Sequence, residues 1–307
     1  MLAPEIQAVV DQMEPDPGTP VPIAETRAAH DRGTAELSGP GEPVAEVREL
    51  ELEGPGGPLS VRLFRPLAPA AGPLPLVAYL HGGGWAVGSL DGFDPLCRAL
   101  ANASGTLVAA VAYRLAPEHP FPAGLDDARA AVRWLAAHAR ELGADPARLA
   151  IAGDSAGGNL AAVTARRLRD EGDSPLRFQA LIYPVCDSAL DTPSYQENGA
   201  GFGLTRAGMQ RYWELYLAGA DGRDPDASPL QAQDLAGLPP AFVLTVYHDV
   251  LRDEGEAYAH ALRAAGVAVT LSRYEGAVHG FFRWLAKTDL ARRAVAEAGA
   301  ALRAGLG

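Results

Sequence analysis

The feature that most constrains the fold is a regular alternation of short apolar runs with longer amphipathic stretches. Apolar runs of strand length occupy residues 76–80, 106–113, 148–152, 178–183, 241–247 and 267–274. Stretches of helical character occupy residues 95–103, 126–142, 156–171, 254–265 and 290–302. Strict alternation of this kind predicts an α/β protein with a mostly parallel central sheet and helices on both of its faces.

Three segments depart from the alternation. Residues 44–52 and 59–64 are β-like and joined by a turn rich in glycine and proline, which predicts a hairpin. Residues 184–238 interrupt the alternation with aromatic and turn-forming residues, which is the expected form of a lid over the carboxyl edge of the sheet. The first forty residues are rich in proline and polar residues, and their short amphipathic stretch contains Ile6, Val9, Val10 and Met13.

Composition excludes several classes of partner. The net charge of −12 argues against nucleic acid and anionic membranes, which both require clustered positive charge. No apolar run approaches the ~18 residues of a membrane span. The N-terminus lacks the basic and apolar regions of a secretory signal, so we expect a cytoplasmic protein. Cys97 and Cys186 form no metal or redox motif, and buried free thiols are expected there.

The sequence Gly153-Asp154-Ser155-Ala156-Gly157 fits the G-x-S-x-G pattern of a nucleophilic serine. The pentapeptide alone is a weak signal in a chain with 34 glycines. Its context strengthens it, because a predicted strand precedes Ser155 and a predicted helix follows. The pattern therefore indicates a serine exposed on a sharp turn between strand and helix.

A second glycine-rich sequence, His81-Gly82-Gly83-Gly84, follows the predicted strand 76–80. Acyl transfer develops a negative oxygen that needs backbone N–H donors, and glycine lets the backbone approach that oxygen closely. The amides of Gly83, Gly84 and Ala156 are therefore predicted to form an oxyanion hole. A phosphate-binding loop is the alternative, but the chain lacks its G-K-[ST] or G-x-G-x-x-G sequence. His81 is expected to hold the loop by hydrogen bonding.

An acid and a base should follow the serine in the order serine, acid, histidine. Asp249 follows the predicted strand 241–247, and His279 follows the predicted strand 267–274. Asp253 and Glu254 compete with Asp249, but they are expected to begin the next helix, where acidic residues favour the helix dipole. We therefore predict Ser155, Asp249 and His279 as a catalytic triad.

These residues belong to sequence blocks that resemble the hormone-sensitive-lipase-like carboxylesterases, also called bacterial family IV esterases. The resemblance covers roughly residues 40–300 and rests on several blocks: HGGGW at 81–85, YRLAPEHPFPA at 113–123, GDSAGGNLA at 153–161, YPV at 183–185, SPL at 228–230, DVLRDEG at 249–255 and HGF at 279–281. One departure is visible, because the family's acid loop usually reads D-P-L and this chain has Val250 at the proline position. An added N–H and a freer φ angle could loosen this loop.

The resemblance implies the α/β-hydrolase fold, with the same triad and oxyanion hole. It also implies a helical cap built from an N-terminal segment, residues 1–40, and an insertion, residues 185–235. The catalytic domain would then comprise residues 41–184 and 236–307. The expected substrates are small-molecule esters of short to medium acyl chains, hydrolysed without a metal or other cofactor.

Two rival functions share parts of this pattern. An amidase or carbamate hydrolase on the same scaffold would carry every motif. A non-enzymatic receptor of the same fold lacks the histidine of the triad, and His279 argues against it. The aromatic residues Trp85, Phe202 and Trp213 are predicted to line an apolar acyl pocket. The sequence leaves the oligomeric state open, with a homodimer as one option.

Overall fold

The computed structural model describes residues 1–13 and 21–307, and its centre is an eight-stranded sheet. The strands lie in the order β1-β2-β4-β3-β5-β6-β7-β8. Their bounds are Glu46–Gly54 (β1), Gly57–Arg65 (β2), Leu74–Leu80 (β3), Leu107–Val111 (β4), Ala144–Asp154 (β5), Leu176–Ile182 (β6), Ala241–His248 (β7) and Val269–Val278 (β8). Only the β1–β2 and β2–β4 pairs are antiparallel, and the pairs from β4 to β8 are parallel. The predicted hairpin and the mostly parallel sheet are confirmed.

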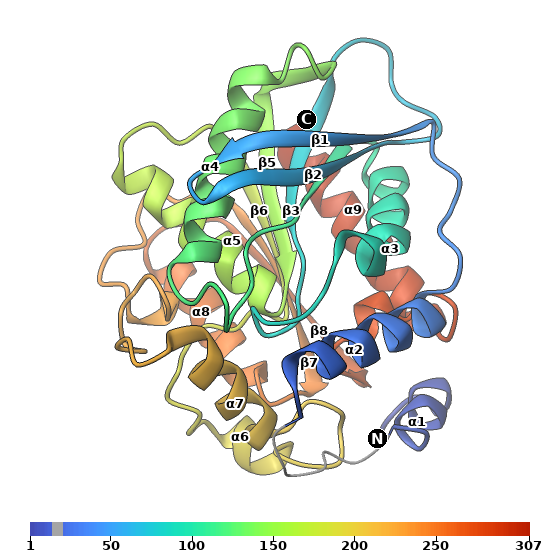
Figure 1. Cartoon of the computed structure of the whole chain (residues 1–307), viewed down its shortest axis with the longest axis vertical. Coiled ribbons are helices and arrows are strands. Elements are labelled where there is room, and N and C mark those ends of the chain that lie inside the picture. Colours follow the sequence, from blue (N-terminus) through green and yellow to red (C-terminus); the bar gives the residue numbers. More distant parts are fainter. Residues whose placement is uncertain (14–20) are drawn as a thin grey trace.

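Helices cover both faces of the sheet (Figure 1). One face carries α3 (Leu90–Ser104) and α9 (Asp289–Leu306), and its core includes Phe93, Leu100 and Leu302. The other face carries α4 (Ala123–His138), α5 (Ala156–Asp170) and α8 (Arg252–Ala264), whose core side chains pack against the opposite face of the strands. Because both faces are covered, every residue of β4 is buried, as expected for a central parallel strand.

The helix expected over residues 95–103 begins five residues earlier than predicted. It starts at Leu90, and the Ser89 hydroxyl caps it by accepting a hydrogen bond from the Gly92 amide at 3.0 Å. Proline is common in the first turn of a helix, which led to the prediction of a start at Pro95. The helix instead begins directly after Ser89, which caps it. Cys97, within this helix, and Cys186 are both buried free thiols, as predicted.

The N-terminal segment contains two helices where the sequence indicated only one short amphipathic stretch. α1 (Pro4–Val10) buries Ile6, and the Ala3 amide bonds the Gly276 carbonyl of β8 at 2.9 Å. α2 (Ile23–Ser38) was not predicted, because its buried residues are the polar Thr34 and Ser38 rather than an apolar stripe. Residues 14–20 of the predicted N-terminal segment lie outside the described residues.

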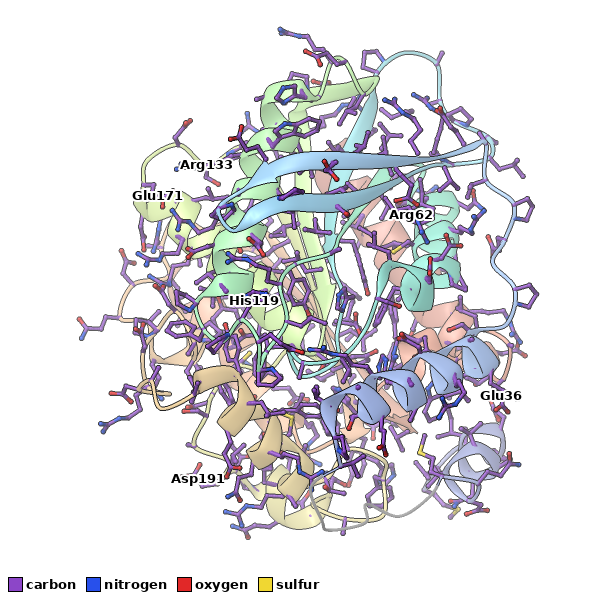
Figure 2. The ribbon with its side chains drawn as sticks, viewed as in Figure 1. Glu36, Arg62, His119, Arg133, Glu171 and Asp191 are labelled. Atoms are coloured by element: carbon purple, nitrogen blue, oxygen red, sulfur yellow. The ribbon has the colours of Figure 1, made fainter. Side chains whose placement is uncertain are left out.

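The segment 185–235 contains α6 (Pro193–Glu197), α7 (Arg206–Leu217) and a short 3-10 turn, η1 (Pro229–Gln231). Figure 1 shows α1, α2, α6 and α7 gathered at one end of the sheet, where β7 and β8 also end. On the far side from them, the helices of one face are tied at the surface, where Arg133 of α4 pairs with Glu171 after α5 (Figure 2). Across residues 1–13 and 21–307, no helix is long and apolar enough to cross a membrane.

Candidate active site

Ser155 lies at the junction of β5 and α5 in a strained backbone conformation. Its φ of 56° and ψ of −120° are unusual for a residue with a side chain. The turn is tight because β5, α5 and the end of β3 meet there. A Cβ at Gly153 would overlap the Gly157 backbone, and one at Gly157 would overlap the Leu80 carbonyl. Glycine is therefore required on both sides of the serine.

The structure brings the three residues of the predicted triad together. The Ser155 hydroxyl lies 2.9 Å from Nε2 of His279, and Nδ1 of His279 lies 2.7 Å from Oδ2 of Asp249. Asp249 is 1% exposed, whereas Ser155 and the His279 side chain are 7% and 11% exposed. The carboxylate is thus shielded from water, while the serine and the histidine face the cavity.

The loop that carries Asp249 is held from two directions. Its Oδ1 accepts a hydrogen bond from the Leu251 amide at 3.0 Å. In the segment 185–235, the Ser194 hydroxyl donates to the Val250 carbonyl at 2.6 Å, and the Asn198 amide donates to the Asp249 carbonyl at 3.3 Å. These bonds fix the loop although it lacks the proline usual at position 250.

The two competing acids belong to the first turn of α8, and neither forms a hydrogen bond or ion pair with His279 among the described residues. Asp253 accepts a hydrogen bond from the Ser194 amide at 2.7 Å and pairs with Arg252. Glu254 is 1% exposed and accepts from the Cys186 amide at 2.7 Å. Burial raises the pKa of Glu254 well above its usual range, against the lowering effect of the amides that donate to it.

The glycine loop after β3 is fastened to the residue that precedes the serine. Asp154 is buried, and its Oδ1 accepts hydrogen bonds from the Gly82 amide at 2.9 Å and the Tyr79 hydroxyl at 2.7 Å. His81 stacks on Tyr113 and its Nδ1 lies 2.8 Å from the Gly82 carbonyl. The residue next to Ser155 therefore also sets the position of the glycine loop.

Gly83 and Gly84 line the same cavity as Ser155, and Ala156 directly follows Ser155 in the chain. Gly83 and Gly84 have φ angles of 121° and 56°, and a Cβ at Gly83 would overlap the Val87 carbonyl. Among the residues that the structure describes, the amides of Gly83, Gly84 and Ala156 donate no hydrogen bond to another protein group. They are available to an oxygen held near Ser155.

A cavity of about 390 Å³ opens above Ser155, which we call the Ser155 cavity. Its walls come from the glycine loop, from α2, from α7 and from the turn after His279. The apolar and aromatic lining residues are Met13, Leu37, Leu204, Met209, Tyr212 and Trp284. Volumes of this size accommodate small organic ligands.

The predicted pocket residues Trp85, Phe202 and Trp213 do not line this cavity. Trp85 is 1% exposed and stacks on Tyr216 with ring centroids 4.2 Å apart. Trp213 packs against Trp85 at 4.6 Å, and Phe202 stacks on His248 at 4.7 Å. In α7, Trp213 and Tyr216 are buried and do not line the Ser155 cavity, whereas Met209 and Tyr212 do. The aromatic cluster is therefore mainly packing beneath α7.

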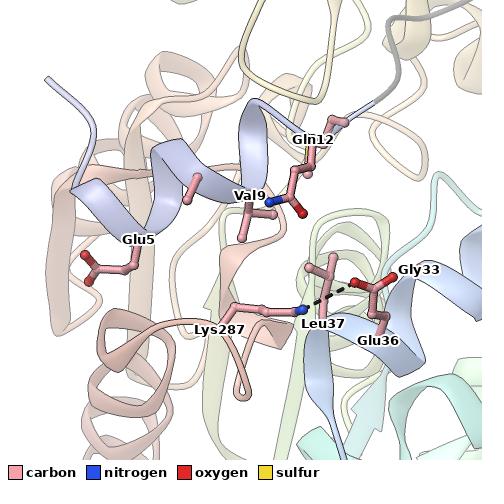
Figure 3. A pocket seen from close by; sticks show the side chains of 9 residues that line it. Glu5, Val9, Gln12, Gly33, Glu36, Leu37 and Lys287 are labelled. Atoms are coloured by element: carbon pink, nitrogen blue, oxygen red, sulfur yellow. Dashed lines mark hydrogen bonds and ion pairs between the residues drawn. The ribbon is translucent and has the colours of Figure 1, made fainter.

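Two further cavities adjoin the Ser155 cavity. One, of about 600 Å³, lies along α7 and shares Gly203, Leu204 and Tyr212 with it, and we call it the α7 cavity. The other, of about 360 Å³, lies between α1 and α2 and shares Met13 and Leu37. Lys287 reaches across this second one to Glu36 at 3.3 Å (Figure 3). The Ser155 cavity thus shares lining residues with both of the other cavities.

Sequence reasoning missed several residues that shape the site. Tyr79 and Ser194 act through hydrogen bonds to residues distant in sequence, and Arg283 enters the cavity from the short 3-10 turn η2 (Phe281–Arg283). Their only local signal is proximity to a motif, as for Arg283 four residues after His279. In the described parts of the chain, no group of three or more metal-ligating side chains gathers.

Fold and site together define the class of the α/β hydrolases, and comparison with known proteins agrees. The family model described as the alpha/beta hydrolase fold matches residues 77–283. The chain is 44% identical over 278 residues to Carboxylesterase NlhH of Mycobacterium tuberculosis, covering 88% of this chain and 87% of that protein. It is 41% identical over 264 residues to the Ethyl acetate hydrolase of Pseudomonas putida, covering 84% and 83%.

Solved structures show the same likeness. The Pyrobaculum calidifontis esterase superposes with a TM-score of 0.92 at 38% identity, covering 100% of both chains. An alpha/beta hydrolase enzyme from the metagenome of Lake Arreo gives a TM-score of 0.95 at 43% identity, covering 99% and 98%. The chain belongs to the α/β-hydrolase fold family, in its hormone-sensitive-lipase-like carboxylesterase branch.

Proposed function

We propose that the protein is a serine carboxylesterase that hydrolyses small-molecule esters of short to medium acyl chains through a covalent acyl-enzyme. The observation that carries the proposal is the hydrogen-bonded series from Ser155 through His279 to Asp249 at the floor of the Ser155 cavity. The names of its relatives, which include a carboxylesterase and an ethyl acetate hydrolase, support the same chemistry.

The first half of the reaction forms the acyl-enzyme. Nε2 of His279 takes the proton of the Ser155 hydroxyl as Oγ attacks the ester carbonyl carbon. The carbonyl oxygen becomes negatively charged and is bound by the amides of Gly83, Gly84 and Ala156. Asp249 holds the Nδ1 proton and stabilises the imidazolium. The tetrahedral intermediate then collapses, and the imidazolium gives its proton to the leaving alcohol.

The second half releases the acid. Water enters the site vacated by the alcohol, His279 takes one of its protons, and the resulting hydroxide attacks the acyl carbon. The same amides bind the oxygen, and Ser155 leaves with the proton returned by His279. Each half uses one proton transfer in each direction, so the enzyme ends in its starting state.

The size of the Ser155 cavity supports short to medium acyl chains. Its volume of about 390 Å³ is near the lower end for ligand sites. Every methylene that fits against its apolar wall contributes up to about 0.8 kcal/mol. Rates should therefore rise with the first few methylenes and fall once the chain reaches Leu204 and Tyr212.

The test is a hydrolysis profile over para-nitrophenyl esters from acetate to dodecanoate, with para-nitroanilides of the same acyl groups alongside. We expect ester hydrolysis with an optimum at short to medium chains and much slower anilide hydrolysis. Acylation is checked by labelling with a fluorophosphonate, which should add one adduct at Ser155 by peptide mass spectrometry. Faster anilide than ester hydrolysis would instead favour an amidase, and labelling elsewhere would contradict the assignment of the nucleophile.

We also propose the 1–40 and 185–235 segments as the cap, the cytoplasm as the location, and a homodimer as the assembly to be tested. Cell fractionation addresses the location, and light scattering coupled to size-exclusion chromatography addresses the assembly. A measured mass near the 32.0 kDa of one chain would contradict the dimer.

A further inference from the structure

A positively charged side chain that has no acidic partner among residues 1–13 and 21–307 lies in the same cavity as Ser155. Arg283 belongs to η2, the 3-10 turn that begins two residues after His279, and it lines the Ser155 cavity together with Ser155 and His279. The reaction proposed above assigns no role to the positive charge of Arg283. Arg283 therefore needs a different explanation.

The guanidinium is fixed by α2 and by an aromatic ring. Nη1 donates hydrogen bonds to the Thr34 hydroxyl at 2.8 Å and to Nε2 of His30 at 3.0 Å. The guanidinium carbon lies 5.2 Å from the centre of the Phe93 ring. The Arg283 backbone is held as well, because its carbonyl accepts from the Ser38 hydroxyl at 2.8 Å. Because these contacts already restrict the side chain, binding a ligand costs Arg283 little further conformational entropy.

The anchors leave the charge uncompensated. Among the described residues, no carboxylate forms an ion pair with Arg283, and its Nε is buried without a hydrogen-bond partner. Burial, followed by the charges of Arg283 and His81, lowers the pKa of His30 well below its usual range, so His30 is a neutral acceptor. Asp154 is the only carboxylate along this cavity's described lining, and its Oδ1 is engaged by Tyr79 and Gly82.

The other terminal nitrogen of the guanidinium, Nη2, lies close to Gly280. Nη2 donates no hydrogen bond within the described residues, and it lies 3.4 Å from the position that a Cβ on Gly280 would occupy. Gly280 directly follows His279. The Nη2 N–H groups thus lie beside the residue that follows His279 and inside the cavity, where they are available to an anion.

We propose that Arg283 is a substrate-binding residue that recognises a carboxylate group carried by the ester, so that the preferred substrates are anionic esters. The proposal rests on the esterase function proposed above. Guanidinium groups bind carboxylates with short, directional hydrogen bonds. These hydrogen bonds are stronger in a cavity that excludes much of the water. The net charge of −12 repels anions at long range, so recognition depends on this local contact.

The carboxylate could belong to the acyl part or to the alcohol part of the ester, and two pairs of substrates distinguish these sources. For the acyl part, the para-nitrophenyl monoester of glutaric acid is compared with para-nitrophenyl pentanoate. For the alcohol part, butyryloxyacetate is compared with ethyl butyrate in a pH-stat. The quantity of interest is the ratio of kcat/KM for the anionic ester to that for its neutral counterpart.

In the wild type we expect a ratio near or above one for at least one pair. In Arg283→Gln that ratio should fall about tenfold or more, because a hydrogen bond to a charged group is lost, while kcat/KM for the neutral ester changes less than about threefold. The control is Arg32→Gln, an exposed arginine of α2 that does not line the cavity, and it should leave the ratio unchanged. Circular dichroism and melting temperature establish that both variants fold.

Parallel losses on anionic and neutral esters, or a wild-type ratio below about one tenth in both pairs, would overturn the proposal while leaving the esterase function intact. A wild type that hydrolyses none of the four esters would contradict the proposed function instead. If Arg283→Gln does not fold, the proposal is tested by inhibition of the wild-type enzyme. Glutarate should then inhibit hydrolysis of the neutral ester more strongly than glutaramide does, and equal inhibition would overturn the proposal.

Discussion

At the scale of single residues, the geometry around Ser155 makes its hydroxyl the atom most sensitive to change. The hydroxyl is 2.9 Å from Nε2 of His279. The residue itself lies in a backbone conformation that its glycine neighbours permit. Ser155→Ala removes the nucleophile and keeps the fold and the three amides. We expect kcat for para-nitrophenyl butyrate to fall by about 10⁴ or more. Near-native kcat in folded Ser155→Ala would show that another group attacks the ester.

The acid residues allow a matched comparison. Asp249→Asn keeps the shape of the side chain but destabilises the required His279 tautomer, so kcat should fall by about 10⁴. Asp253→Asn, four residues away, weakens contacts with Ser194 and Arg252 and should lower the melting temperature more than kcat. Steady-state kinetics and thermal melts of both variants give the answer. A greater loss of kcat in Asp253→Asn would mean that the acid has been misassigned.

At the scale of elements, we expect α7 to limit how long an acyl chain the site accepts. Tyr212 and Leu204 separate the Ser155 cavity from the α7 cavity, and the Tyr212 ring also lies against Gly84, where a Cβ would overlap it. Removing the ring should join the two spaces. The α7 helix is therefore expected to act as a divider as well as a cover.

The variant that tests this is Tyr212→Ala. The ratio of kcat/KM for octanoate to that for acetate should rise at least several-fold, because each added methylene contact contributes up to about 0.8 kcal/mol. Gln210→Ala is the control, since Gln210 is exposed on the same helix and lines neither cavity. An unchanged chain-length profile in folded Tyr212→Ala would exclude Tyr212 as the divider.

At the scale of the whole molecule, Glu254 couples stability to pH. It is buried in the first turn of α8 and accepts hydrogen bonds from the amides of Cys186 and Asp187 at the start of the 185–235 segment. Its pKa is raised in the folded state, chiefly by burial, so the native protein binds the proton more tightly than the unfolded chain does. The contribution to stability is therefore greatest below the unfolded value and is lost as the pH rises through the folded pKa.

Glu254→Gln removes this loss of stability and can still accept both hydrogen bonds. Its melting temperature should match the wild type at pH 4 and exceed it at pH 8, with about 2–4 °C for each kcal/mol in a chain of roughly this size. Thermal melts of both proteins across this pH range measure the difference. This coupling of stability to pH would be contradicted if the melting temperature of Glu254→Gln minus that of the wild type were smaller at pH 8 than at pH 4.

The sequence by itself determined the parts whose neighbours along the chain define them. The strand-helix alternation specified the sheet and its helices because periodicity depends on which faces are buried. Ser155, Asp249 and His279 follow strands whose carboxyl ends share one edge of a parallel sheet, so local position placed them together. The glycine loop was identifiable because its backbone geometry excludes side chains.

Only the tertiary structure decided which side chains face the cavity. Trp85, Trp213 and Tyr212 are all aromatic residues, yet Trp85 and Trp213 pack against each other and Tyr212 lines the Ser155 cavity. The helix α2 was not apparent because polar residues form its buried side, and their partners, including Arg283, are some 250 positions away in sequence. A side chain's surroundings depend on packing between distant segments, which no local pattern encodes.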